Sequence, residues 1–353
     1  MQGRITLRDV TAQAIRPGRR RGEATVATIA RLAGVSPPTV SKVLNGRSGV
    51  AEDTRQRVEA LLQQHGYRRP DAVAPAAVLE VVFHALEGQA AVAIMRGVEE
   101  VARTRELAVG FSELTGRNTD RRGWVDQVLA RRPTGVITVY ASFTPREQAR
   151  FAAAGIPLVA LDPTGEPLHT TPSVGAANWN GGLAAARHLI ELGHRRIAVI
   201  GGPVSYLCSR ARLDGFHAAM DEAGIPVDPA LVRHGRFMFD DGLAHGVALL
   251  KFHDPPTAIV CGDDLQAMGV YEAARQLGLR IPDDLSVVGF DDIDYAQWMG
   301  PPLTTVRQPL AKMGATAAEL VLRLADGEEL TQTRVELATS LIVRGSTAPP
   351  RRT

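Results

Sequence analysis

The chain has 353 residues and a net charge of +2, which is enough length for two or three domains with apolar cores. Its two cysteines, Cys208 and Cys261, exclude a disulfide framework and, by their spacing, a cysteine-based zinc site. No apolar run approaches about 18 residues, and no apolar segment follows the basic N-terminus. We therefore expect neither a membrane span nor a signal peptide, but a cytoplasmic protein.

The positive charge is concentrated at the N-terminus. Residues 1–70 hold 13 Lys or Arg against 5 Asp or Glu, a net charge of +8, whereas the remainder carries −6. A basic head on a mildly acidic body indicates a polyanionic partner for the head alone. Residues 1–24 are rich in arginine and have no periodicity, so we expect a flexible basic arm there.

Residues 25–70 show the pattern of three short helices. Thr25 is placed to cap the first helix, and Gly34 to end it. Asn45-Gly46 ends the second, and the third runs from about Glu52 to Gly66.

The second helix opens on Ser-Pro-Pro. Proline is tolerated in a first helical turn, because the amides there have no intrahelical partner. With Pro37 and Pro38 in that turn, the first amide that Ser36 can cap is that of Thr39. The prolines therefore predict a rigid, partly apolar helix end.

Two helices joined by Gly34-Val35 form a helix-turn-helix, whose second helix enters the major groove of DNA by its N-terminal end. The alternative is a helical hairpin on some other protein surface, but the basic charge favours DNA. Prolines can contact thymine methyl groups, hydroxyls can bond phosphate or base edges, and lysine can reach guanine acceptors. The predicted DNA contacts are Thr25, Ser36, Pro37, Pro38, Thr39, Ser41, Lys42 and Asn45.

After a linker at residues 71–78, β-rich runs such as "GVITVYA", "RIAVIGG" and "LSVVGFDD" alternate with helical stretches. This alternation predicts βαβ units and parallel sheets. The units are too many for one sheet, so we expect two doubly wound α/β lobes, starting near Leu79 and near Val174. The body would span residues 79–347, followed by a disordered tail at 348–353.

Polar residues follow several predicted strands. Ligands of open parallel sheets bind beyond the carboxyl ends of the strands, and Asp and Arg can grip vicinal hydroxyls there. The predicted effector contacts are Arg210, Asp264, Asp162 and Asp291, with Trp179 and Trp298 stacking on a sugar face. For Asp291 a structural or capping role is the alternative, and for the two tryptophans ordinary packing.

The sequence shows no motif for metal binding, dinucleotide binding or catalysis. The nine histidines show no metal-ligand spacing, and "IGGP" after a strand is too short for a dinucleotide-binding fingerprint. No nucleophile–base pair stands out, so we expect no enzyme, no metal and no cofactor. A transport binding protein would need a signal sequence and has no use for a helix-turn-helix.

The segment "TVATIARLAGVSPPTVSKVLNG", with "VAEDTRQRVEALLQQHGYRR" after it, closely resembles the head of the lactose-repressor (LacI/GalR) family. "SVGAANWNGGLAAARHLIELGHRRIAVIGG" and "IPDDLSVVGFDDIDYAQWMGPPLTTVRQP" are similar to its effector-domain signatures, so the resemblance extends to about Val343. It implies a body like periplasmic sugar-binding proteins, with a small molecule between two lobes. The three strands that cross between the lobes would fall near residues 172, 302 and 332.

The resemblance also implies function. It points to a repressor that binds a pseudo-palindromic operator as a homodimer and responds to a carbohydrate, for which xylose or a xylo-oligosaccharide is our candidate. Arg210 and Asp264 match the family's main effector-contacting positions. The chain departs from the family pattern where an aromatic pair of the first lobe is replaced by Ala90 and Ala91. It departs again in the linker, where a hinge helix could start only at Pro75 and the first strand is expected from Glu80. About one helical turn remains, which is too short to be stable alone, so we expect an extended segment.

Overall fold

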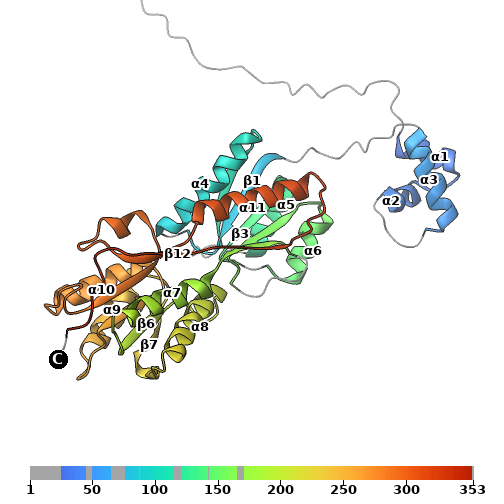
Figure 1. Ribbon diagram of the computed structural model, residues 1–353. Helices are drawn as coiled ribbons and strands as arrows, with labels where there is room; N and C mark the ends of the chain where they lie inside the picture. Colours follow the sequence, from blue (N-terminus) through green and yellow to red (C-terminus); the bar gives the residue numbers. More distant parts are fainter. Residues whose placement is uncertain are drawn as a thin grey trace, which may run out of the picture. The chain divides into compact units, whose positions relative to one another are not determined.

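Figure 1 shows the computed structural model, which describes residues 25–44, 50–64, 76–86, 88–114, 121–141, 143–164 and 171–351. The chain divides into two compact units, a head within Met1–Ala74 and a body within Pro75–Thr353. Across the described residues, no helix is both long and apolar enough to cross a membrane.

The head contains three helices, α1 (Val26–Ala33), α2 (Pro37–Leu44) and α3 (Glu52–Gln64). The hydroxyl of Thr25 accepts a hydrogen bond from the amide of Thr28 at 3.2 Å, and Gly34 ends α1 with a φ of 66°. Both predicted boundaries of the first helix are confirmed. The helices enclose one small core, formed by Ile29, Ala30, Ala33, Val40, Val43 and Val58.

Several predictions for the head concern residues outside the described ranges. These are the basic arm at 1–24, the Asn45-Gly46 helix stop and the end of the third helix at Gly66.

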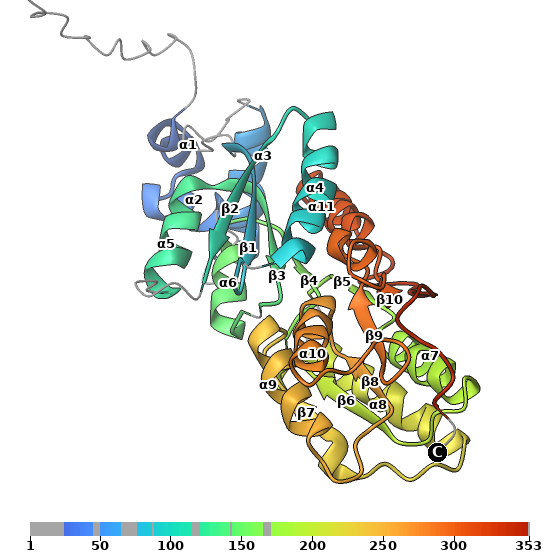
Figure 2. The same cartoon turned by 90° about the vertical axis from the view of Figure 1, so that its left-hand side faces the viewer.

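The body consists of two α/β lobes, each built on a six-stranded sheet flanked by helices on both faces (Figure 2). The strand orders are β11-β5-β4-β3-β1-β2 and β12-β10-β9-β8-β6-β7. The strand pairs are parallel, apart from the antiparallel pair of β10 and β12. The predicted pair of doubly wound lobes is confirmed.

The first lobe contains β1 (Ala76–Phe83), α4 (Gly88–Thr104), β2 (Ala108–Glu113), α5 (Arg121–Arg131), β3 (Pro133–Val139), α6 (Pro145–Ala153), β4 (Leu158–Leu161), β5 (Ser173–Ala176), α11 (Leu310–Ala325) and β11 (Arg334–Leu337). The second contains α7 (Asn178–Glu191), β6 (Ile197–Gly201), α8 (Leu207–Glu222), η1 (Pro229–Leu231), β7 (Val232–His234), α9 (Phe239–Leu250), β8 (Ala258–Cys261), α10 (Asp264–Gln276), β9 (Ser286–Asp291), η2 (Asp294–Gln297), β10 (Thr304–Arg307) and β12 (Ser340–Ile342).

The chain passes between the lobes three times, at Ala177, at Gln308-Pro309 and at Ala338-Thr339. Each crossing lies five to seven residues beyond the predicted position, 172, 302 or 332. The predicted start of the second lobe near Val174 is therefore wrong, because Val174 pairs with β4 and β11 in the first sheet. Pairing across the sheet, and not local composition, determines where the strands of this region begin and end.

The first lobe also begins earlier than predicted. Residues 76–78 of the expected linker belong to β1, where Ala76 pairs with Pro133 of β3. Leu79 lies within this strand and is completely buried in the first-lobe core. Alanine has little intrinsic preference for strands, so only the neighbouring strand extends β1 to this point.

Two glycines bring α7 and α8 together backbone to backbone. A Cβ on Gly182 of α7 would collide with the carbonyl oxygen of Arg212, and a Cβ on Gly215 of α8 with the carbonyl oxygen of Trp179. This close approach fixes Arg212 relative to Asn178 at the start of α7.

The C-terminal segment packs against the second lobe. The carbonyl of Ala348 accepts a hydrogen bond from Nε2 of His194 at 2.9 Å, and Arg351 forms an ion pair with Asp284 at 2.6 Å. The predicted disordered tail at 348–353 is therefore wrong as far as Arg351. The sequence shows no helix or strand pattern here, because side chains of the lobe satisfy the backbone of an irregular segment.

We expect this anchor to make stability depend on pH through His194. Burial lowers the pKa of His194 below its usual value, so the folded state favours the neutral ring. A depressed histidine pKa contributes stability above pH ~6.5, and this contribution is lost as the pH falls toward the folded pKa. His194→Asn should cost about 1–3 kcal/mol at pH 7.5, because buried partners lose hydrogen bonds.

Urea unfolding between pH 5.5 and 7.5 tests this. The midpoint of the wild type should fall on acidification more steeply than that of His194→Asn. His253→Asn, at an exposed position, is the control and should match the wild type. If the urea midpoints of the wild type and of His194→Asn fell equally with decreasing pH, the expectation would be contradicted.

Candidate functional site

The exposed face of α2 carries the side chains predicted to contact DNA. Val40 and Val43 turn into the core of the head, whereas the other face is solvent-exposed. The exposed residues are Ser36, Pro37, Pro38, Ser41 and Lys42, with Thr39 and Thr25 half-buried. Asn45, the remaining predicted contact, lies outside the described residues.

Ser36 starts α2 as the sequence predicts. Its Oγ accepts a hydrogen bond from the amide of Thr39 at 3.4 Å, and the two hydroxyl oxygens lie 2.9 Å apart. Because Pro37 and Pro38 have no amide hydrogen, Thr39 supplies the first N–H available to the cap. The predicted cap is confirmed, and the exposed helix end carries two hydroxyls that could exchange this bond for a phosphate oxygen.

The body contains a pocket of about 140 Å³ lined by both lobes. The first lobe contributes residues that follow β1 and β3 and the start of α4. The second contributes the starts of α8 and α10, the loop before α9 and the end of β9. Its principal polar and aromatic lining residues are His84, Tyr140, Tyr206, Arg212, Phe237, Asp263 and Asp291.

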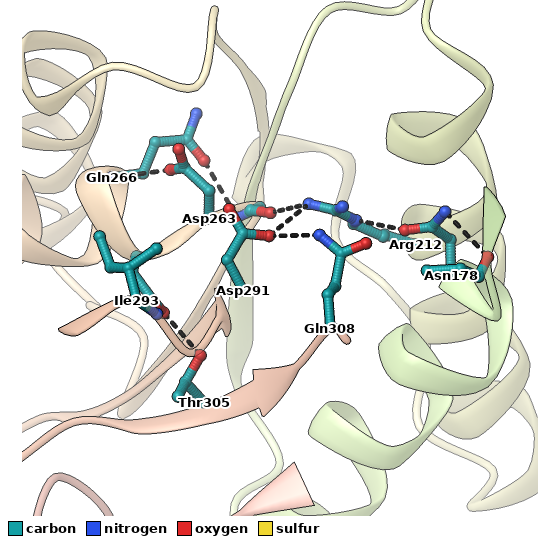
Figure 3. Close-up of polar contacts among 11 residues, drawn as sticks. Asn178, Arg212, Asp263, Gln266, Asp291, Ile293, Thr305 and Gln308 are labelled. Atoms are coloured by element: carbon teal, nitrogen blue, oxygen red, sulfur yellow. Dashed lines mark hydrogen bonds and ion pairs between the residues drawn. The ribbon is translucent and has the colours of Figure 1, made fainter. Parts of the chain in front are cut away.

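Arg212 of α8 is the cation of this pocket, with only 9% of its surface exposed. Its Nε donates to Oδ1 of Asn178 at 2.8 Å, and its Nη1 donates to the carbonyl of Gly262 at 2.5 Å (Figure 3). The guanidinium carbon lies 3.8 Å from the centre of the Phe290 ring, a cation–π contact. Among the described residues these two hydrogen bonds use two of the five N–H groups, which leaves donors for a ligand.

Asp291, at the end of β9, faces Arg212 across the pocket floor. Its Oδ1 lies 3.8 Å from Nη1 of Arg212 and accepts a hydrogen bond from Nε2 of Gln308 at 2.6 Å (Figure 3). Gln308 follows β10, at a crossing between the lobes. The pocket therefore joins α8, β9 and a crossing segment through one carboxylate.

The adjacent aspartates at the start of α10 differ in whether they reach the pocket. Asp263 lines the pocket and caps α10, its Oδ1 accepting from the amide of Gln266 at 2.8 Å. Asp264 is completely buried and does not line the pocket. Its two oxygens accept from the hydroxyl of Thr305 at 2.6 Å and the amide of Ile293 at 2.9 Å.

Backbone strain is concentrated at the strand ends that meet here. Tyr140 after β3 has a φ of 51°, Asp162 after β4 a φ of 46°, and Asp291 a φ of 110°. A positive φ of this kind costs about 1–3 kcal/mol for each residue other than glycine, and such strain clusters at functional sites.

Burial dominates the electrostatics of this region. It raises the pKa of Asp162 to about 6, although the positive charge of Arg212 opposes the shift. Oδ2 of Asp162 is buried without a hydrogen-bond partner among the described residues. Burial also raises the pKa values of Asp263 and Asp291. It raises the pKa of Cys208 to about 12, so this thiol is protonated and inert near neutral pH.

Of the six side chains predicted to bind the effector, Asp291 alone is among the lining residues of this pocket. Asp162 and Asp264 are buried beside it. Trp179 and Trp298 are outside the lining, with 43% and 67% of their surfaces exposed.

Arg210 is exposed on α8, and the structure places Arg212 in the pocket instead. Positions two apart on a helix differ by about 200° in direction, so these two arginines lie on opposite faces. A signal for Arg212 was present in the sequence: it lies on one helical stripe with Cys208, Phe216 and Ala219, all of them buried. The lining aromatics Tyr206 and Phe237 come from loops and had no such signal.

Within the described part of the chain, no group of three His, Cys, Asp or Glu side chains is arranged to hold a metal ion.

Comparisons with known proteins agree with this arrangement. Residues 25–70 match bacterial regulatory proteins of the lacI family, and residues 186–347 match a periplasmic binding protein-like domain. Over 333 residues the chain is 30% identical to the HTH-type transcriptional repressor PurR of Haemophilus influenzae (strain PittEE), covering 92% of this chain and 98% of the relative.

Two solved structures extend the similarity to the fold. One is the complex of the transcriptional regulator CelR with cellobiose, with a TM-score of 0.70, 30% identity and coverage of 91% of this chain and 99% of the other. The second is the lac repressor dimer bound to operator and the anti-inducer ONPF, with a TM-score of 0.68, 29% identity and coverage of 92% and 99%.

The relatives are repressors and not enzymes. From its helix-turn-helix head, its two-lobed body and these similarities, the chain belongs to the LacI family, as a DNA-binding transcriptional repressor regulated by a small-molecule effector.

Proposed function

We propose that the effector of this repressor is a carbohydrate held between the two lobes by Arg212, Asp263 and Asp291. The observation that carries the proposal is the pairing of Arg212 with Asp291 in a pocket of about 140 Å³. An arginine and a carboxylate offer donors and acceptors side by side, which suits vicinal hydroxyl groups. Tyr206 and Phe237 supply apolar faces for the C–H side of a sugar ring.

The pocket volume of about 140 Å³ supports a ligand that places one ring between the lobes. Cavities of about 150 Å³ are known to admit one six-membered ring. The similarity to the CelR–cellobiose complex supports the same class of ligand. Xylose and xylo-oligosaccharides are our first candidates, and the protein would act in the cytoplasm, where its operator is.

A thermal-shift panel tests the effector class. The panel contains xylose, xylobiose, glucose and cellobiose. Purine bases and nucleosides are included as alternative ligands of another chemical class. A ligand at a hundredfold excess over its Kd stabilises the folded state by about 2.7 kcal/mol. Stabilisation by a base or nucleoside alone would overturn the carbohydrate proposal.

Arg212→Gln should weaken effector binding by about 1–3 kcal/mol, because it leaves pocket acceptors unpaired. Arg210→Gln is the matched control, since it makes the same change two residues away on the exposed face of α8. Titration calorimetry with the sugar selected by the panel measures both. Equal loss in the two variants, or loss only in Arg210→Gln, would contradict the assignment.

We further propose that the exposed end of α2 reads a pseudo-palindromic operator, with Ser36 to Lys42 in the major groove and Thr25 at the backbone. Lys42→Ala should relax discrimination between operator variants by about 1–3 kcal/mol. Lys251→Ala, an exposed lysine of the body, is the control. Selection from random duplexes followed by fluorescence anisotropy measures the change. Unaltered base preference in Lys42→Ala would rule out base contact by this lysine.

A homodimer is the third part of the proposal. Each lobe exposes large apolar side chains: Phe111, 42% exposed, on the edge strand β2, and Tyr295 and Trp298, 37% and 67% exposed, at η2. The rings of Tyr295 and Trp298 lie 5.7 Å apart and form one aromatic patch. Exposed apolar patches mark interaction sites, and the similar lac repressor structure is a dimer.

Light scattering at micromolar concentration should give a mass near two chains. Trp298→Glu should shift the population toward monomer, because it places a charge in an apolar interface. Trp179→Glu, at a second exposed tryptophan, serves as the control. A mass near four chains, or an unchanged dimer in Trp298→Glu, would contradict this part of the proposal.

A further inference from the structure

The turn after β9 has a backbone that needs support. Asp291 and Asp292 both have positive φ angles, 110° and 57°, although neither is glycine. Such a conformation persists only where the surroundings hold it. Asp292 stands between Asp291 and Ile293 in the chain. Both of these neighbours line the pocket between the lobes, which is called the effector pocket below.

The carboxylate of Asp292 is held by two arginines from separate segments. Oδ2 accepts from Nε of Arg307 at 2.6 Å, and Oδ1 accepts from Nη2 of Arg344 at 2.6 Å. Only 7% of the Asp292 side chain is exposed. Arg307 ends β10, and Arg344 lies in the C-terminal segment after β12. Charge-assisted hydrogen bonds to both oxygens of a nearly buried carboxylate are strong and directional.

Arg344 is itself fixed in place. Its Nη1 donates to the carbonyl of Leu303 at 2.8 Å, and its backbone amide donates to the hydroxyl of Thr304 at 2.9 Å. The C-terminal segment therefore presents a rigid guanidinium to the turn after β9.

The ion pairs of Asp292 are directly connected to Asp291, a residue that lines the pocket. The backbone carbonyl of Asp291 accepts from the amide of Gln308 at 3.3 Å, and its side chain accepts from Nε2 of the same residue. Arg307, which holds Asp292, directly precedes Gln308. The two adjacent aspartates are thus attached to two adjacent residues at the point where the chain crosses into the first lobe.

We propose that Asp292, clamped by Arg307 and Arg344, is a positioning residue for the effector site: it holds the strained turn so that Asp291 stays against Arg212, and it makes the C-terminal segment part of the site's support. The positioning is a property of the turn itself, and its consequence for effector binding rests on the proposed function. Asp292 does not line the effector pocket and acts through Asp291 and Ile293.

Four variants of the full chain test the proposal: Asp292→Asn, Arg344→Gln, Arg344→Lys and Arg351→Gln. The last is a matched control, because Arg351 lies on the same C-terminal segment and forms an ion pair at 2.6 Å, but with Asp284. Hydrogen–deuterium exchange reports on the turn through the amides of Ile293 and Gln308, which bond to Asp264 and Asp291.

The first two variants should exchange these amides about tenfold faster, and the control should match the wild type. Arg344→Lys keeps the charge but not the fork geometry and should lie between Arg344→Gln and the wild type. Unchanged exchange at the turn in Asp292→Asn would overturn the proposal. Equal acceleration in the strands β6 and β8 would also overturn it, since that shows general loss of stability.

Effector binding is the second readout, with xylose and cellobiose as probes in calorimetry. Affinity should fall about tenfold in Asp292→Asn and Arg344→Gln while operator affinity is retained. Wild-type affinity for a probe in the two variants, together with faster exchange, would overturn the link to the pocket. If neither sugar binds the wild type, the carbohydrate proposal is weakened, and the exchange data alone decide whether the clamp positions the turn.

Discussion

One buried cation determines the arrangement of the body's polar interior. Taking the guanidinium of Arg212 out of water costs several kcal/mol unless it is paired and hydrogen-bonded. The compensation comes from the ring of Phe290, the side chain of Asn178, the carbonyl of Gly262 and the carboxylate of Asp291. These groups belong to different elements, α7, the turn after β8, and β9. Arg212 finds all of these partners only where the three elements are correctly placed, so its position in the pocket depends on the fold of the second lobe.

The same arrangement prepares the pocket for a ligand. Asp263 and Asp291 are held by hydrogen bonds to Gln266 and Gln308 before anything binds. A ligand that pairs with pre-positioned groups loses less free energy to ordering them, which favours tight binding of a small polar molecule. The strained backbone at Tyr140, Asp162 and Asp291 fits this view, because the folded protein maintains conformations that a free chain would leave.

The head has a core of its own and folds around residues that the pocket does not touch. A ligand can shift an equilibrium only by binding its states with different affinity. An effector bound at the proposed site can therefore control the operator only if the body binds it with different affinity in the DNA-bound and the free states. The polar interior is suited to this, since Gln308 and the segment that crosses to α11 are bonded to a residue that lines the pocket.

The sequence by itself determined the helix-turn-helix, its Thr25 and Ser36 caps and the two parallel-sheet lobes, because capping chemistry and strand–helix alternation are local patterns. It also placed Asp291 at the end of a strand. Only the tertiary structure decided that Arg212 and not Arg210 enters the pocket, and that Asp263 and not Asp264 lines it. Neighbouring residues of one helix or turn share the same local signal, and the packing of α8 on α7 and of α10 on β9 selects which one faces the pocket. The C-terminal segment up to Arg351 has no local pattern at all, and its place was set by side chains distant in the sequence, His194 and Asp284.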